Sequence, residues 1–251
     1  MINGAQSRFS ALLPSDAAIV EATDEDMWSH GLLPEEAACL RSASHKRLRE
    51  FTAGRNCARG VLELLGCNAA PILVGESRQP ILPAEAAVSV THSEGYCAAA
   101  GVRKDTCLSI GIDTETNREL DVELRDLICT GQELVSIARL PRVACDWHKL
   151  VFSAKESLYK AWYPLCHRYI DFLEVTLQID PRKSAFSAVG PRDLRRALGL
   201  ATVTGRYLIE HDRIYTAVTV SSCVPLRSSY DRCEQRASVA NSSGDADSTK
   251  K

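Results

Sequence analysis

The sequence predicts an α+β fold made of two similar α/β subdomains. A helix-like stretch followed by short strand-like stretches occurs twice, once before about residue 106 and once after it. With 251 residues, of which 45% are hydrophobic, the chain can bury one sizeable core or two small ones. We therefore expect subdomains at residues 1–106 and 107–224, followed by a tail at 225–251.

The first subdomain is predicted to contain a long helix over residues 34–66. Pro34 suits the first turn of a helix, the two glutamates after it complement the helix dipole, and Gly66 offers a C-terminal stop. Gly54 is an interruption within this pattern.

Strand-like residues follow this helix. The stretch VSVTHSEGYCAAAG (88–101) predicts two short strands around a polar turn, and CLSIGIDTE (107–115) predicts a third. Together the three favour a β meander.

The second subdomain repeats the order of helix and strands. A polar helical stretch is expected through Leu140, with a break at Gly131, and a further helix over DWHKLVFSAKESLYKAWY (146–163). Strands of a second sheet are then predicted at 172–180, 184–189, 201–210 and 213–220.

Composition limits the location and the partners of the chain. The residues from 225 to 251 are rich in Ser, Asp and Ala, which predicts a disordered tail. No stretch approaches the roughly 20 apolar residues of a membrane span. The ten cysteines form no C-x-x-C pair and a net charge of −2 gives no basic field. We therefore expect a cytoplasmic protein that binds neither membranes nor nucleic acids.

Two acids stand at alternate positions of the third predicted strand. Successive side chains of a strand point to opposite faces, so Asp113 and Glu115 share one face, where they repel each other unless a cation lies between them. On the helix, Glu156 and Lys160 are four residues apart and also share a face. Each pattern alone is typical of a solvated strand edge or a surface salt bridge. Together, three carboxylates on two elements could hold a hard divalent cation, with the lysine facing a phosphate.

A stripe of arginines lies upstream, in HKRLREFTAGRNCARG. Arg47, Phe51, Arg55 and Arg59 recur every four residues and drift slowly around the predicted helix. Guanidinium groups bind phosphate oxygens in a bidentate manner, so the stripe is a candidate anchor for a phosphate monoester. A solvated helix face remains the alternative, for Arg59 in particular.

Two further polar stretches lie beside predicted strands, SRQPILP (77–83) and SVTHS (89–93). His92 follows the strand-like VSV by two residues and stands next to Thr91. This position suits a phosphate contact better than a purely structural histidine.

In this order, the motifs resemble the phosphopantetheinyl transferases of the surfactin and enterobactin type. The similarity extends from about Arg47 to Ala161, through R-x-x-x-F-x-x-G-R-x-x-A-R, R-Q-P-x-x-P, S-x-T-H, G-I-D-T-E and F-S-A-K-E-S-x-x-K-A. The resemblance implies a pseudo-dimer of two α/β halves with coenzyme A in the cleft between them and Mg²⁺ as cofactor. Because the internal pair completes the site, a monomer is expected.

The resemblance also implies roles for individual residues. It implies that Arg47 and Arg55 bind the 3'-phosphate of coenzyme A. Contacts to coenzyme A are implied for Arg47, Arg55, Arg78, Thr91, His92, Asp113 and Lys160, metal ligation for Asp113, Glu115 and Glu156, and catalysis for Glu156 and Lys160.

Four positions depart from the family pattern. Ser77, Leu82, Val88 and Ser93 stand where members often have lysine, tryptophan, glycine and cysteine. Arg78 could replace the lysine that is missing at position 77.

The implied reaction moves the 4'-phosphopantetheine arm of coenzyme A onto a serine of an acyl or peptidyl carrier protein and releases 3',5'-adenosine diphosphate. Glu156 could take the serine proton directly or through water. Fatty acid, polyketide, nonribosomal peptide and siderophore pathways remain open. A magnesium-dependent nuclease and a non-catalytic coenzyme A binder are the alternatives.

Because losing one acid relieves repulsion, Asp113→Ala is expected to stop transfer without lowering the stability of the metal-free protein.

Overall fold

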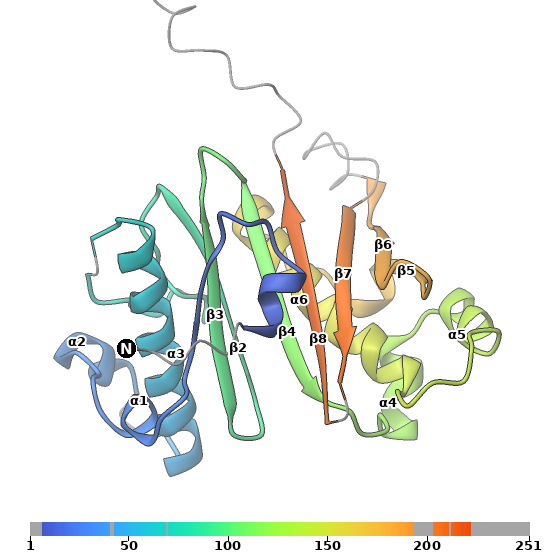
Figure 1. The fold of residues 1–251 in the computed structure, drawn as a ribbon, viewed down its shortest axis with the longest axis horizontal. Coiled ribbons are helices and arrows are strands. Elements are labelled where there is room, and N and C mark those ends of the chain that lie inside the picture. The colour runs from blue at the N-terminus through green and yellow to red at the C-terminus, as the bar shows by residue number, and fades with distance from the viewer. Residues whose placement is uncertain (1–6, 41–42, 69, 193–202, 211, 222–251) are drawn as a thin grey trace, which may run out of the picture. The chain divides into compact units, whose positions relative to one another are not determined.

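Two antiparallel sheets lie next to each other in the computed structural model (Figure 1). The structure describes residues 7–40, 43–68, 70–192, 203–210 and 212–221. The predicted tail, at 225–251, lies outside these residues.

The first sheet has the strand order β1-β3-β2 and the second the order β4-β8-β7-β6-β5. The strands are β1 (Ala18–Glu21), β2 (Ala86–Ser93), β3 (Tyr96–Arg103), β4 (Ser109–Thr116), β5 (Thr176–Asp180), β6 (Ala185–Val189), β7 (Val203–Ile209) and β8 (Arg213–Val220). The helices are η1 (Arg8–Ala11), α1 (Glu25–Ser29), α2 (Pro34–Ala37), η2 (Ala38–Leu40), α3 (His45–Leu64), α4 (Val122–Ile128), α5 (Gly131–Ile137), α6 (Trp147–Cys166) and η3 (Phe172–Glu174). The predicted fold class is confirmed.

Helix α3 covers one face of the first sheet and shares a core with it, built from residues such as Cys57, Val61 and Cys97. The prediction of one continuous helix over 34–66 is wrong. α2 and η2 end by Leu40, and the Ser44 side chain accepts a hydrogen bond from the Arg47 amide, which starts α3. A serine that satisfies a free amide in this way favours a new helix start over continuation of the preceding one.

The prediction of a β meander is also wrong, because β4 does not join β2 and β3 in a ladder. It pairs with β8 along its whole length and so begins the second sheet. Alternate amides of β4 then point toward β2, where they meet side chains instead of backbone. The Ile112 amide donates to Ser89 Oγ and the Thr114 amide donates to Thr91 Oγ1, each at 3.0 Å. Two hydroxyls thus join the two sheets. The predicted subdomain boundary at residue 106 stays a prediction.

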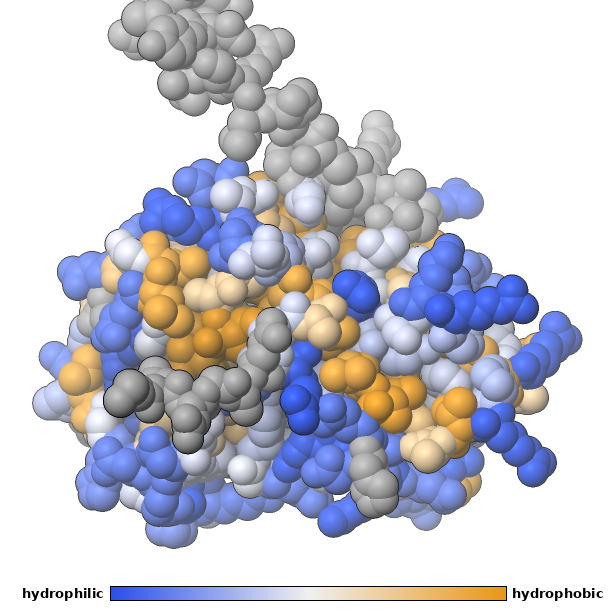
Figure 2. Space-filling view, in the orientation of Figure 1, coloured by the Kyte–Doolittle hydropathy of each residue, from blue (hydrophilic) through white to orange (hydrophobic). Residues whose placement is uncertain are grey.

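The N-terminal segment covers the junction of the sheets on the face seen in Figure 1. Phe9 is fully buried and its ring meets the Tyr215 ring edge-on at 5.4 Å. Figure 2 shows hydrophobic residues gathered in the middle of this face, with hydrophilic residues around the rim. Within the described ranges, no helix is long and apolar enough to cross a membrane.

Helix α6 packs on the second sheet and begins where Asp146 caps the His148 amide. At Gly111, strand β4 lies directly on this helix. A Cβ at this position would stand 1.9 Å from the Ser157 carbonyl oxygen, a separation that no real contact allows. The absence of a side chain at Gly111 therefore sets how closely β4 approaches α6.

This contact gives a first prediction. Gly111→Ala should push β4 away from α6 and lower the free energy of unfolding by more than about 3 kcal/mol, because the clash is with backbone and no flexible side chain can yield. Gly131→Ala is the matched control, since a Cβ there meets nothing within 4 Å and the residue starts α5. Urea denaturation should show unchanged or raised stability for the control. Equal stability of the two variants would contradict the close-approach argument.

Candidate active site

Four polar residues form a stripe along α6, at spacings of four, three and four residues. Lys149, Ser153, Glu156 and Lys160 therefore share one helix face. This face looks onto β4, from which Asp113 and Glu115 project. The sequence patterns that seemed separate meet here.

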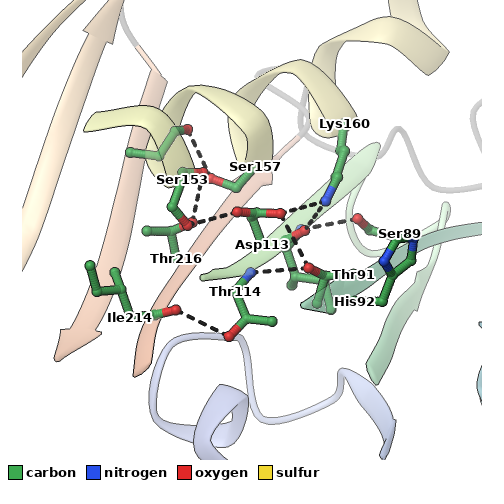
Figure 3. Close-up of polar contacts among 12 residues, drawn as sticks. Ser89, Thr91, His92, Asp113, Thr114, Ser153, Ser157, Lys160, Ile214 and Thr216 are labelled. Atoms are coloured by element: carbon green, nitrogen blue, oxygen red, sulfur yellow. Dashed lines mark hydrogen bonds and ion pairs between the residues drawn. The ribbon is translucent and has the colours of Figure 1, made fainter. Parts of the chain in front are cut away.

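Asp113 is buried, with only 5% of its surface exposed, and three side-chain donors hold it in place. Lys160 Nζ donates to Oδ1 at 2.7 Å, Thr91 Oγ1 donates to the same oxygen at 3.2 Å, and Ser153 Oγ donates to Oδ2 at 2.8 Å (Figure 3). Lys160 Nζ also donates to the Ile112 carbonyl at 3.2 Å. Hydrogen bonds to an ionised carboxylate are among the stronger ones, so the position of Asp113 is well defined.

Glu115 and Glu156 are half-buried beside Asp113. Burial raises the pKa of both carboxyls, and the charge of Asp113 raises both further. Lys149 lies 3.2 Å from Glu115 and lowers the pKa of that carboxyl, which opposes the effect of burial. Lys160 lowers the pKa of Glu156 in the same way. Glu156 has neither a hydrogen bond nor an ion pair within the described part of the chain. It is the one acid of the three that remains available to accept a proton.

The donor set fits a hard divalent cation in its chemistry, since three carboxylates reach the site from two elements. In the described residues, however, no three acids, histidines or cysteines lie close enough together to hold a metal ion as they stand. The ammonium groups of Lys160 and Lys149 pair with Asp113 and Glu115 instead. A cation that binds here competes with these ammonium groups for the carboxylates.

A pocket of about 280 Å³ opens beside Lys160 and is lined by Arg55 of α3, Tyr159 of α6 and Arg78 of the loop between α3 and β2. The Arg55 guanidinium lies over the Phe51 ring at 4.2 Å, and burial lowers its pKa. Its Nε is buried without a hydrogen-bond partner in the described residues. A buried donor of this kind needs an acceptor, and the pocket can supply one from a ligand.

Arg47 and His92 also come together, although 45 residues separate them. Arg47 Nη1 lies 3.5 Å from His92 Nε2, and Glu50 lies 3.9 Å from the other ring nitrogen. Burial lowers the pKa of His92, while Glu50 acts in the opposite direction. The two residues form a polar edge near the N-terminus of α3.

Two residues that were predicted to contact phosphate, Arg59 and Thr91, have other partners. Arg59 pairs with the fully buried Glu36, and its side chain is only 13% exposed. The predictions that Arg59 contacts phosphate or lies on a solvated helix face are therefore both wrong. The Thr91 hydroxyl is already used, as acceptor from the Thr114 amide and donor to Asp113. Its side chain therefore positions the acid.

Lys155, next to Glu156 in the sequence, belongs to a separate and fully buried network. Its Nζ donates at 2.8 Å to Glu133 and to the carbonyls of Ile128 and Phe172. Glu133 in turn accepts from the Leu177 amide at 2.7 Å. Lys155 therefore fastens α6 to the segments around α5 and η3, on the side of the helix away from Ser153 and Lys160.

Lys149, Ser153 and Ser89 also belong to the site, although none of them was among the residues predicted from the sequence. Counting back from Glu156 by three and seven residues would have found Ser153 and Lys149, because both spacings stay on one helix face. Ser89 had no such signal, because its role depends on how β2 meets β4.

Comparison with known proteins extends the similarity across both sheets. A family model of the 4'-phosphopantetheinyl transferase N-terminal domain matches residues 35–101, and a model of the 4'-phosphopantetheinyl transferase superfamily matches residues 109–210. The chain is 36% identical over 221 residues to 4'-phosphopantetheinyl transferase Svp of Streptomyces mobaraensis. The aligned region covers 85% of this chain and 89% of that protein. It is 33% identical over 197 residues to 4'-phosphopantetheinyl transferase PptT of Mycobacterium tuberculosis, with 75% and 86% covered. Enterobactin synthase component D of Escherichia coli strain K12 is 38% identical over 126 residues, 49% of this chain and 59% of that protein.

The hydrogen bonds of Asp113 reverse the expectation that Asp113→Ala leaves stability unchanged. The substitution leaves Lys160, Thr91 and Ser153 without their shared acceptor, so the free energy of unfolding without metal should fall by about 2–4 kcal/mol. Asp126→Ala, an exposed acid of α4, is the control and should change stability little. Denaturant titration in a chelating buffer measures both. Unchanged stability of Asp113→Ala would show that relief of repulsion outweighs the lost hydrogen bonds.

Proposed function

The chain belongs to the 4'-phosphopantetheinyl transferases, and from this we propose that it transfers the arm of coenzyme A to carrier proteins with the help of Mg²⁺. The observation that supports the proposal most directly is the meeting of Asp113, Glu115 and Glu156 with Lys160 at the edge of a pocket that also contains Arg55. A carboxylate set for a cation and a basic pocket for phosphates are what transfer from a nucleotide ester needs.

In this proposal the nucleotide end of coenzyme A binds in the pocket lined by Arg55 and Arg78. The unpartnered Nε of Arg55 supports an interaction with the 3'-phosphate. Arg47, which is also on α3, and His92 on β2 complete the contact. Arg78 takes the place of a lysine next to this phosphate. Thr91 contributes by holding Asp113.

The reaction starts when the serine hydroxyl of the carrier protein attacks the phosphorus that bears pantetheine. A new oxygen–phosphorus bond forms, the bond to 3',5'-adenosine diphosphate breaks, and the serine proton passes to Glu156 directly or through water. The raised pKa of Glu156 makes it a better acceptor for this proton than an exposed glutamate. When bound, Mg²⁺ neutralises charge on the phosphate oxygens. Lys160 stabilises the same charge from the helix.

A second pocket, of about 140 Å³, lies beside α6 and suits the pantetheine arm. It is lined by Glu156, Trp162 and Phe172, and Tyr159 lines both this pocket and the nucleotide pocket. The arm leaves the reacting phosphorus close to Glu156, so it can enter this largely apolar space.

The proposed reaction needs only one chain, because α3 and α6 both contribute to the nucleotide pocket. Acyl and peptidyl carrier proteins are the proposed partners. We place the reaction in the reducing cytoplasm, where the thiol of the new arm and the free cysteines of the described residues stay reduced.

Mass spectrometry of a carrier protein tests the proposal. Incubation with Mg²⁺, coenzyme A and an apo carrier should add about 340 Da to the carrier, the mass of the arm. Without the divalent cation, the increase should be lost. A carrier that keeps its mass while coenzyme A binds would instead support a non-catalytic coenzyme A binder.

The phosphate anchor can be tested by comparing two ligands. Arg55→Ala should weaken binding of coenzyme A by about tenfold or more and binding of dephospho-coenzyme A much less, because only the first carries the 3'-phosphate. Arg49→Ala is the matched control, since Arg49 lies on the same helix but pairs with Glu25. Calorimetric titration gives both affinities. Equal losses for the two ligands would remove Arg55 from the proposed phosphate contact.

A further inference from the structure

Lys149 is a cation that the proposed reaction does not use, yet it lies in the site. Its Nζ is 3.2 Å from Glu115 Oε2, and its side chain is only 16% exposed. The ammonium also lies 5.6 Å from the centre of the Phe152 ring. Across the described residues, Glu115 is the only carboxylate within ion-pair distance of Lys149. The lysine is therefore held at one of the proposed metal ligands rather than at the solvent.

The charges of the site explain what such a lysine does. Three carboxylates, Asp113, Glu115 and Glu156, face the ammonium groups of Lys149 and Lys160, which leaves one net negative charge. Without the two lysines, three half-buried or buried acids would repel one another. A divalent cation would compete with the ammonium groups for the same carboxylates.

The two lysines differ in how firmly they are held. Lys160 donates both to Asp113 and to the Ile112 carbonyl, and it faces the nucleotide pocket. Lys149 lies two helical turns away from Glu156 and its ion pair is with Glu115 alone. Lys149 can leave Glu115 by a rotation of its side chain, without movement of α6.

We propose that Lys149 is an internal counter-ion of Glu115 that competes with the divalent cation and thereby sets the affinity of the site for it. The inference rests on the proposed function, because it takes Glu115 as a metal ligand. In the metal-free chain the lysine neutralises Glu115 and so lessens the repulsion among the three acids. On binding, the cation takes the Glu115 oxygen and the ammonium group swings away.

The variant Lys149→Met tests the competition, because it keeps the length of the side chain and removes the charge. The purified full chain is titrated with Mg²⁺ alone, and its melting temperature is followed at each concentration. The variant should bind Mg²⁺ about three- to tenfold more tightly than wild type, since the cation no longer displaces an ion pair. It should also melt at a lower temperature than wild type before the metal is added, and gain more from it.

Two further variants separate the local effect from overall charge. Lys183→Met removes an equal charge from a lysine that pairs with Asp180 on a remote turn, and it should leave the Mg²⁺ affinity unchanged. Lys149→Arg keeps the charge and can pair with Glu115 through a fork, so it should bind Mg²⁺ more weakly than wild type. This second variant decides the question even if Lys149→Met does not fold.

Several results would overturn the inference. Unchanged or weaker Mg²⁺ binding by Lys149→Met, with normal binding by wild type, removes Lys149 as a competitor and leaves the proposed function intact. Weaker binding of coenzyme A with unchanged Mg²⁺ affinity means that Lys149 contacts the substrate instead. If wild type shows no Mg²⁺ binding and transfers the arm equally well in a chelating buffer, both the inference and the metal part of the proposed function are wrong.

Discussion

The site depends on the direct contact between β4 and α6 at Gly111. Because no side chain separates the strand from the Ser157 carbonyl, Asp113 comes within hydrogen-bond distance of Ser153 and Lys160. A larger residue would move the strand outward and separate these groups. The glycine of GIDTET is therefore as important to the site as the two acids, although it has no chemistry of its own.

The junction of the two sheets adds a second constraint. Strand β4 pairs with β8 on one side, so the amides on its other side need acceptors from β2. Ser89 and Thr91 provide them with side-chain oxygens, and Thr91 uses its proton to hold Asp113. The contact that joins the two halves is thus also a contact that positions a proposed metal ligand. The structure of the junction and the geometry of the site cannot vary independently.

Much of this could be predicted from the sequence because it depends on local spacing. The alternation of Asp113 and Glu115, and the four-residue step from Glu156 to Lys160, fixed which side chains share a face, and α6 forms close to where its pattern predicts. The pairing of β4 with β8 could not be predicted, since strand patterns do not specify partners. The burial of Arg59 depends on a tertiary contact in the same way, whereas the start of α3 at the Ser44 cap has a local signal.

The buried network of Lys155 has a consequence for how the site responds to its ligands. Lys155 fastens one side of α6 to the segments around α5 and η3, while Ser153 and Lys160 fasten the other side to β4. With anchors on opposite sides, the helix cannot turn about its own axis. Any adjustment to a cation or a phosphate must then come from rotamers of the long lysine and glutamate side chains. We therefore expect the backbone of the site to change little when its ligands bind.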